Sequence, residues 1–84
     1  MTELARTPKQ IGTIIQRARK KRGWTQAELA TRAGLRQATI STIETGGATT
    51  KLNSLLAILA ALDLEFLIGP RTKSDATAIE EMFS

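Results

Sequence analysis

Residues 24–46, WTQAELATRAGLRQATISTIETG, encode two short amphipathic helices with a glycine turn between them. Thr25 and Glu28 have the spacing of a capping box, so a helix is expected to begin near Thr25. Gly34 can adopt the left-handed conformation that ends this helix without a steric penalty, and a second helix then runs from about Arg36 to Thr45. This order predicts a helix-turn-helix, a unit that sets its second helix into a DNA groove.

Apolar residues support this interpretation and extend it toward the N-terminus. Ala30 is small where the two helices should cross, and aliphatic side chains face the expected core at Leu29, Leu35, Ile40 and Ile43. Thr7 and Pro8 have the order of an N-cap and a first helical residue, which predicts a helix from Pro8 to about Arg22 that stops at Gly23. One face of this helix carries the i, i+3, i+4, i+7 pattern of burial at Ile11, Ile14, Ile15 and Ala18.

A fourth helix is expected from Leu52 to Leu62, after a loop at residues 46–50. Its apolar face is wide, as for a helix buried against the other three and against a second subunit, and comprises Leu52, Leu55, Leu56, Ile58, Leu59 and Leu62. The predicted fold class is therefore all-α, a compact four- to five-helix DNA-binding domain with a helix-turn-helix.

The spacing of the apolar residues changes from helical to alternating at residues 64–68, which predicts a short strand ending at Gly69. No second strand is evident, so its expected partner is the same strand in another copy, related by a two-fold axis. The dimerisation residues would be Leu64, Phe66 and Ile68. The alternative is that these residues extend the fourth helix or cover the core as a loop.

These elements predict the organisation of the whole chain. An N-terminal arm occupies residues 1–7, the DNA-binding domain 8–63, the dimerisation strand 64–69 and a polar tail 70–84. The tail either forms one short helix after Ser74 and Asp75 or is frayed.

Length and composition exclude several classes of protein. The 84 residues make one small domain, and such a domain buries only about 60% of its unfolded surface, so a second copy is expected to help. There is no cysteine or histidine, hence no disulfide framework, no metal cluster and no evident nucleophile and base. We therefore expect no cofactor, no metal and no enzyme. Without a signal peptide or a membrane-length apolar run, a cytoplasmic, nucleoid-associated protein is expected.

The charge is unevenly distributed along the chain. Residues 1–51 carry ten basic and three acidic side chains, a net charge of +7, whereas residues 52–84 carry two basic and five acidic ones, a net charge of −3. The basic excess coincides with the helix-turn-helix, where phosphate would lie. Nucleic acid is therefore favoured over a merely solubilising surface.

The start of the second motif helix normally faces base edges in the major groove. The candidate base-reading residues here are Arg36, Gln37, Ala38, Thr39, Ser41 and Thr42. Arginine can hold guanine in a bidentate pair, glutamine can do the same for adenine, and a methyl group can touch thymine. On an unrelated helix, the same residues would simply be exposed polar side chains.

Phosphate contacts are expected beside this helix. Gln26 stands at the amino end of the first motif helix, where its amide and nearby backbone donors can bind a phosphate. Thr25 is primarily a cap with phosphate contact as a second role, and Arg32 and Lys51 are further candidates.

Two other features concern structure more than binding. Arg19 and Glu44 can pair across the first and third helices and hold the reading helix, an interaction worth only about 0–1 kcal/mol if it is exposed. Trp24 is interpreted as a packing residue at the junction of the first two helices and not as a platform for a base.

These residues resemble the helix-turn-helix family that includes the phage lambda and 434 repressors and Cro, over about residues 10–64. Residues 23–30, GWTQAELA, and 36–41, RQATIS, are particularly similar to HipB antitoxins, and the strand at 64–68 stands where HipB-type dimers are closed by an intermolecular strand pair. The resemblance implies a dimer that represses its own operon and binds HipA, a serine/threonine kinase toxin. It also implies phosphate contact by Gln26 and base contact at Arg36, Gln37, Ala38 and Ser41.

Such a dimer would place its reading helices one DNA turn apart, about 34–36 Å, which predicts a palindromic operator. Two other functions remain open. One is a free-standing regulator of the phage-repressor type without a toxin. The other is an interaction protein that mainly inhibits a toxin, with DNA as a scaffold.

Overall fold

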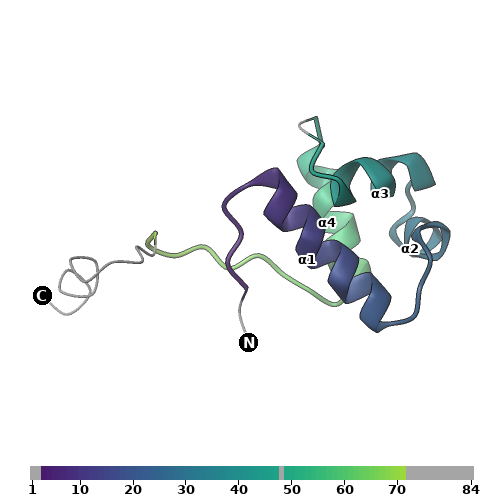
Figure 1. Ribbon diagram of the computed structural model, residues 1–84, viewed down its shortest axis with the longest axis horizontal. Coiled ribbons are helices and arrows are strands. Elements are labelled where there is room, and N and C mark those ends of the chain that lie inside the picture. The colour runs from purple at the N-terminus through teal and green to yellow at the C-terminus, as the bar shows by residue number, and fades with distance from the viewer. Residues whose placement is uncertain (1–2, 48, 72–84) are drawn as a thin grey trace, which may run out of the picture.

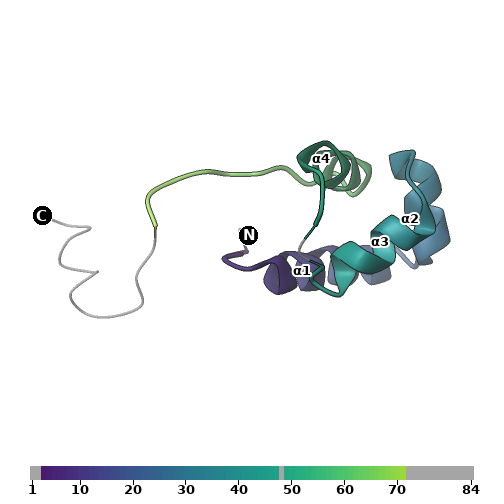
Figure 2. The same ribbon diagram turned by 90° about the horizontal axis from the view of Figure 1, so that it is seen from above.

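The computed structural model describes residues 3–47 and 49–71. This part of the chain contains four helices, which are α1 (Pro8–Lys21), α2 (Gln26–Ala33), α3 (Gln37–Glu44) and α4 (Leu52–Ala61). Helix α1 packs on α3, and α2 packs on both α3 and α4 (Figure 1). Seen from above, α1 and α3 lie at one level and α4 at another, with α2 at the end of the molecule (Figure 2). The predicted all-α helix-turn-helix domain is confirmed.

The helix ends form where the local sequence predicts them. Thr7 Oγ1 accepts a hydrogen bond from the Gln10 N–H at 3.1 Å, and Pro8 is the first helical residue. At α2 both halves of the capping box are present, and Gly34 ends the helix with a φ of 70° in the left-handed region. These caps satisfy backbone groups that every helix end leaves unpaired.

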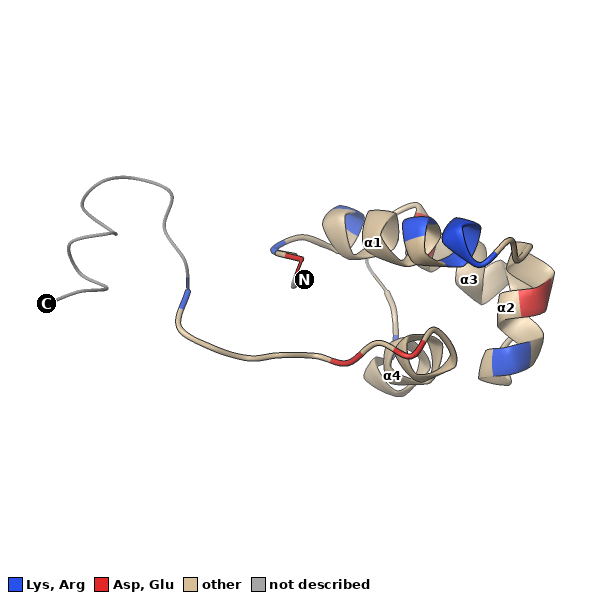
Figure 3. Cartoon of the chain, turned by 90° about the horizontal axis from the view of Figure 1, so that it is seen from below, with Lys and Arg blue, Asp and Glu red and all other residues tan. Residues whose placement is uncertain are grey.

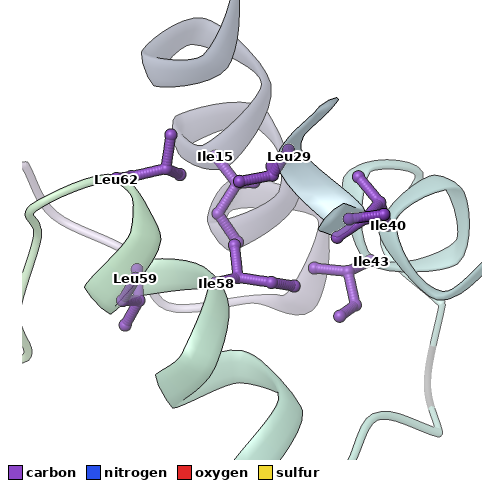
Figure 4. Close-up of a cluster of buried hydrophobic side chains, with 8 residues drawn as sticks. Ile15, Leu29, Ile40, Ile43, Ile58, Leu59 and Leu62 are labelled. Atoms are coloured by element: carbon purple, nitrogen blue, oxygen red, sulfur yellow. The ribbon is translucent and has the colours of Figure 1, made fainter. Parts of the chain in front are cut away.

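Side chains from all four helices form the core (Figure 4). The fully buried side chains are Ile15, Leu29, Ile40, Ile58 and Leu62. Leu35, expected in the core, is only partly buried and packs against its edge. In the single chain the wide apolar face of α4 is buried only in part, because Leu52 is 64% exposed and Leu56 44%. Burial of the rest against a second subunit stays a prediction. Ile58 and Leu59 face the core, whereas Leu52 lies two turns before Leu59, at the start of the helix, and Leu56 lies at the edge of the apolar face.

The chain leaves α4 through a sharp turn. Leu62 caps the helix, Asp63 has a φ of 57°, and the Leu64 N–H donates to the Leu59 carbonyl at 2.7 Å. Residues 64–71 then run past the N-terminal arm as a non-helical segment (Figure 1), so extension of α4 is ruled out. Leu64 packs against the core of its own chain, whereas Ile68 is 98% exposed. Pairing of this segment with a second copy stays a prediction.

Two points concern the tail and membrane insertion. The helix expected after Ser74 lies outside the described residues. Within residues 3–47 and 49–71, no helix has both the length and the apolar character needed to cross a membrane.

Candidate nucleic-acid interface

Helix α3 has one buried face and one exposed polar face. Ile40, Ile43 and Glu44 are buried against the other helices. The remaining positions include every predicted base-reading residue: Arg36, Gln37, Ala38 and Thr42 are exposed, and Thr39 and Ser41 are half-buried. Arg36 is the N-cap residue of α3, and its side chain makes no capping hydrogen bond. Four of the six predicted readers are therefore exposed and the other two are partly exposed, on α3 or at its N-cap.

The start of α2 provides backbone donors beside α3. Thr25 Oγ1 accepts the Glu28 N–H at 3.1 Å, and the Thr25 N–H donates to Glu28 Oε1 at 3.2 Å, so Thr25 is confirmed as a cap. This capping satisfies the third N–H of the helix, whereas a helix start leaves the N–H groups before it without intrahelical acceptors. Together with the positive end of the helix dipole, these groups favour an anion.

A buried ion pair joins α1 to the end of α3. Arg19 Nε donates to Glu44 Oε2 at 2.7 Å, and Arg19 Nη2 donates to Oε1 at 3.0 Å. The two side chains are 10% and 1% exposed, so the small value expected for a surface pair does not apply. The hydrogen bond to Glu44 raises the pKa of Arg19, with burial acting in the opposite direction. Arg19 Nη1 also donates to the Trp24 carbonyl at 2.7 Å, which fixes the chain as it enters α2.

Close packing of α1 on α3 depends on Gly12. This residue is buried in α1, and a Cβ on it would lie 2.6 Å from the Glu44 carbonyl oxygen. Any larger residue would therefore push α3 away from α1.

Gln26 is also connected to the buried pair, a contact that the sequence did not predict. Its half-buried side chain donates from Nε2 to Glu44 Oε1 at 3.2 Å. The two residues are 18 positions apart, so no helical spacing signals this contact. A candidate phosphate-binding amide is thus held by the last residue of the reading helix.

Arginine side chains surround Trp24 at the junction of α1 and α2. The guanidinium carbon of Arg32 lies 4.1 Å from the ring centroid, and that of Arg22 lies 5.8 Å away. Trp24 is half-buried and packs against the core, which confirms its predicted packing role. Arg22 also donates to the Leu62 carbonyl and so ties the end of α1 to the end of α4. The guanidinium of Arg32 is stacked on Trp24 in the free protein. Its contact with a phosphate stays a prediction.

The loop between α3 and α4 is bonded to the reading helix and ends at Lys51. The Gly47 N–H donates to the Thr42 carbonyl at 2.8 Å, and the exposed Lys51 is the N-cap residue of α4.

Lysine and arginine lie along α1 and at the end of α2, whereas acidic residues mark the chain as it leaves α4 (Figure 3). The uneven charge of the sequence is therefore also uneven in space.

Comparison with known proteins identifies related sequences. The sequence profile of the helix-turn-helix family matches residues 15–68. Antitoxin HipB of Escherichia coli K12 is 37% identical over 75 residues, which cover 89% of this chain and 85% of the relative. Antitoxin HipB of Escherichia coli O6:H1 is 33% identical over 75 residues, with 89% and 80% covered.

Solved structures agree with the sequence relatives. The structure of a HipA-HipB-O2-O3 complex contains a chain with a TM-score of 0.77 and 35% identity, and the match covers 86% of this chain and 100% of that one. A HipB-O4 20mer complex gives a TM-score of 0.74 and 33% identity, covering 89% and 99%. The restriction-modification controller protein C.AhdI from Aeromonas hydrophila gives 0.64 and 28%, covering 69% and 88%. This chain therefore belongs to the helix-turn-helix family and, within it, to the HipB antitoxins.

Proposed function

We propose that this chain is a dimeric, sequence-specific DNA-binding repressor that regulates its own operon and acts as the antitoxin of a HipA-like serine/threonine kinase. The observation that carries the proposal is the exposed polar face of α3, held rigidly by the buried Arg19–Glu44 pair. The related HipB chains support it, because one of them was solved in a complex with HipA. The protein acts in the bacterial cytoplasm by binding and not by catalysis.

In this function the outward face of α3 reads bases in the major groove. Arg36, Gln37 and Ala38 lie at the start of the helix, where side chains reach base edges most directly, and Thr39, Ser41 and Thr42 follow on the same helix. Phosphates are bound on either side, by the start of α2 and by the start of α4. The phosphate-binding residues are Thr25, Gln26, Arg32 and Lys51.

The dimer is proposed to form through the segment after α4. An open groove of about 850 Å³ lies between residues 3–6, α1 and residues 63–71. Apolar side chains stand exposed along this segment, including Phe66 at 44% and Ile68 at 98%. A second copy would cover them about a two-fold axis, which pairs the two segments and buries apolar surface on both copies. The palindromic operator follows from that symmetry.

DNA binding is tested by fluorescence anisotropy with the chain's own upstream DNA and a scrambled fragment, at two salt concentrations. Two variants remove the same exposed positive charge, Arg36→Ala on the reading helix and Arg17→Ala on α1. The wild type should prefer the upstream fragment, and Arg36→Ala should lower that preference by about 1–3 kcal/mol. Arg17→Ala should leave the preference unchanged.

Equal, salt-sensitive binding to both fragments would leave only a basic surface and would contradict the repressor role. An equal loss of preference in both arginine variants would contradict the placement of the reading helix.

The antitoxin role has its own test. The purified chain is mixed with the HipA-like kinase from its own genome in the absence of DNA, and complex formation and kinase inhibition are measured. A complex supports the antitoxin role. No complex and no inhibition would favour a free-standing regulator, and a complex without operator preference would favour toxin binding as the main task.

A further inference from the structure

We propose that Glu44 is a positioning residue that orients the amide of Gln26 for contact with a DNA phosphate. The inference rests on the proposed function, because it assumes that Gln26 touches DNA. It assigns to a buried carboxylate on α3 a role in the phosphate contact made by α2.

Glu44 is held at the centre of a fixed network. Both carboxylate oxygens accept from Arg19, at 2.7 and 3.0 Å, and Oε1 also accepts from Gln26 Nε2 at 3.2 Å. Arg19 in turn donates to the carbonyl of Trp24, two residues before Gln26. The same two charged residues therefore fix the backbone that enters α2 and the side chain that begins it.

The chemistry of a carboxylate determines which way the amide faces. An ionised carboxylate only accepts hydrogen bonds, so the Gln26 amide must turn Nε2 and not Oε1 toward Glu44. One N–H is then used inside the protein, and the other remains for an outside acceptor. A phosphate oxygen also only accepts hydrogen bonds. A Gln26 amide that was not held by Glu44 and turned its oxygen toward the phosphate would therefore be repelled.

The arrangement also prepares the contact before DNA arrives. A free glutamine side chain loses rotamer entropy when it is immobilised at an interface, and that loss opposes binding. In this structure the Gln26 amide is already bonded to a buried group on the reading helix. The base-reading helix and the phosphate-binding amide should consequently dock as one unit.

The experiment is a double-mutant cycle on operator affinity with Glu44→Gln and Gln26→Ala. Gln26→Ala should weaken binding about tenfold, as for loss of a hydrogen bond to a charged group. Glu44→Gln should weaken binding several-fold when Gln26 is present and less than about twofold in the Gln26→Ala background. Glu80→Gln removes a carboxylate of the polar tail and is the control, with no expected change. Equal losses from Glu44→Gln in both backgrounds would overturn the positioning role.

Since Glu44→Gln strips Arg19 of its buried partner, the variant can lose its fold. The cycle is then repeated with Arg19→Met/Glu44→Leu, which removes both charges and the acceptor for Gln26. A second readout needs no variant of the network. NMR scalar coupling across the hydrogen bond should connect Gln26 Nε2 to the Glu44 carboxyl carbon, with the exposed Gln37 amide as the negative control.

Absence of that coupling would overturn the contact itself. A wild-type chain that fails to prefer operator over scrambled DNA would overturn the proposed function and this inference with it. Operator preference without energetic coupling between Gln26 and Glu44 would overturn the inference alone.

Discussion

Replacing Gly12 by alanine is expected to force α1 away from α3 and to destabilise the domain. The new Cβ would lie 2.6 Å from the Glu44 carbonyl oxygen and closer still to that of Ile43. Both neighbours are backbone atoms, so neither can rotate away as a flexible side chain would. The Arg19–Glu44 pair crosses the same helix contact and would be stretched with it.

The size of the effect follows from two opposing contributions. Overpacking of a close contact costs about 3 kcal/mol, and alanine regains about 0.5–1 kcal/mol because it favours a helix interior over glycine. The net loss of unfolding free energy is therefore about 2–2.5 kcal/mol. For a domain of this size, such a loss lowers Tm by about 10–20 °C.

The assay is thermal unfolding followed by circular dichroism at one fixed protein concentration, because dimer stability depends on concentration. Two other glycines, Gly34 and Gly69, calibrate the result, since a Cβ added to either would meet no heavy atom of the described chain within 4 Å beyond its sequence neighbours. Gly69→Ala should change stability by less than about 0.5 kcal/mol. Gly34→Ala should cost about 1–2 kcal/mol, because its φ of 70° strains an L side chain. A Gly12→Ala variant with the same Tm as the Gly69→Ala variant would refute the reasoning.

Three further predictions concern the buried pair and the interface. Arg19→Met alone should cost about 3–5 kcal/mol in urea unfolding, whereas Arg19→Met/Glu44→Leu should cost far less because no charge is left buried and unpaired. Glu44 raises the pKa of Arg19, so the stabilisation is complete below the unfolded pKa and is lost only as pH rises through the higher folded value. The stability difference between wild type and the double variant, measured by urea unfolding, should therefore not change with pH near neutrality through titration of Arg19. Gln37→Ala should relax base preference at one operator position by about 1–3 kcal/mol, whereas Lys51→Ala should weaken all sequences alike, as measured by anisotropy on an operator library.

The candidate site was predictable where it depends on position along one helix. The outward face of α3 follows from the periodic burial of Ile40 and Ile43, and its exposed start at Gln37 is confirmed. Arg32 is different, because the sequence marked it as a basic residue near DNA without indicating that its guanidinium stacks on Trp24. Such stacking depends on side-chain direction, which spacing alone leaves open.

The sequence by itself determined the helix ends and the helix-turn-helix. The capping box at Thr25 and the left-handed turn at Gly34 are interactions between residues a few positions apart, so their signals are local. Only the tertiary structure decided that Arg19 and Glu44, 25 positions apart, are buried together and that Gln26 joins them. It also decided that Leu52 and Leu56 stay exposed. These outcomes depend on how the helices cross, and helix crossing is a property of the packed core that no single segment encodes.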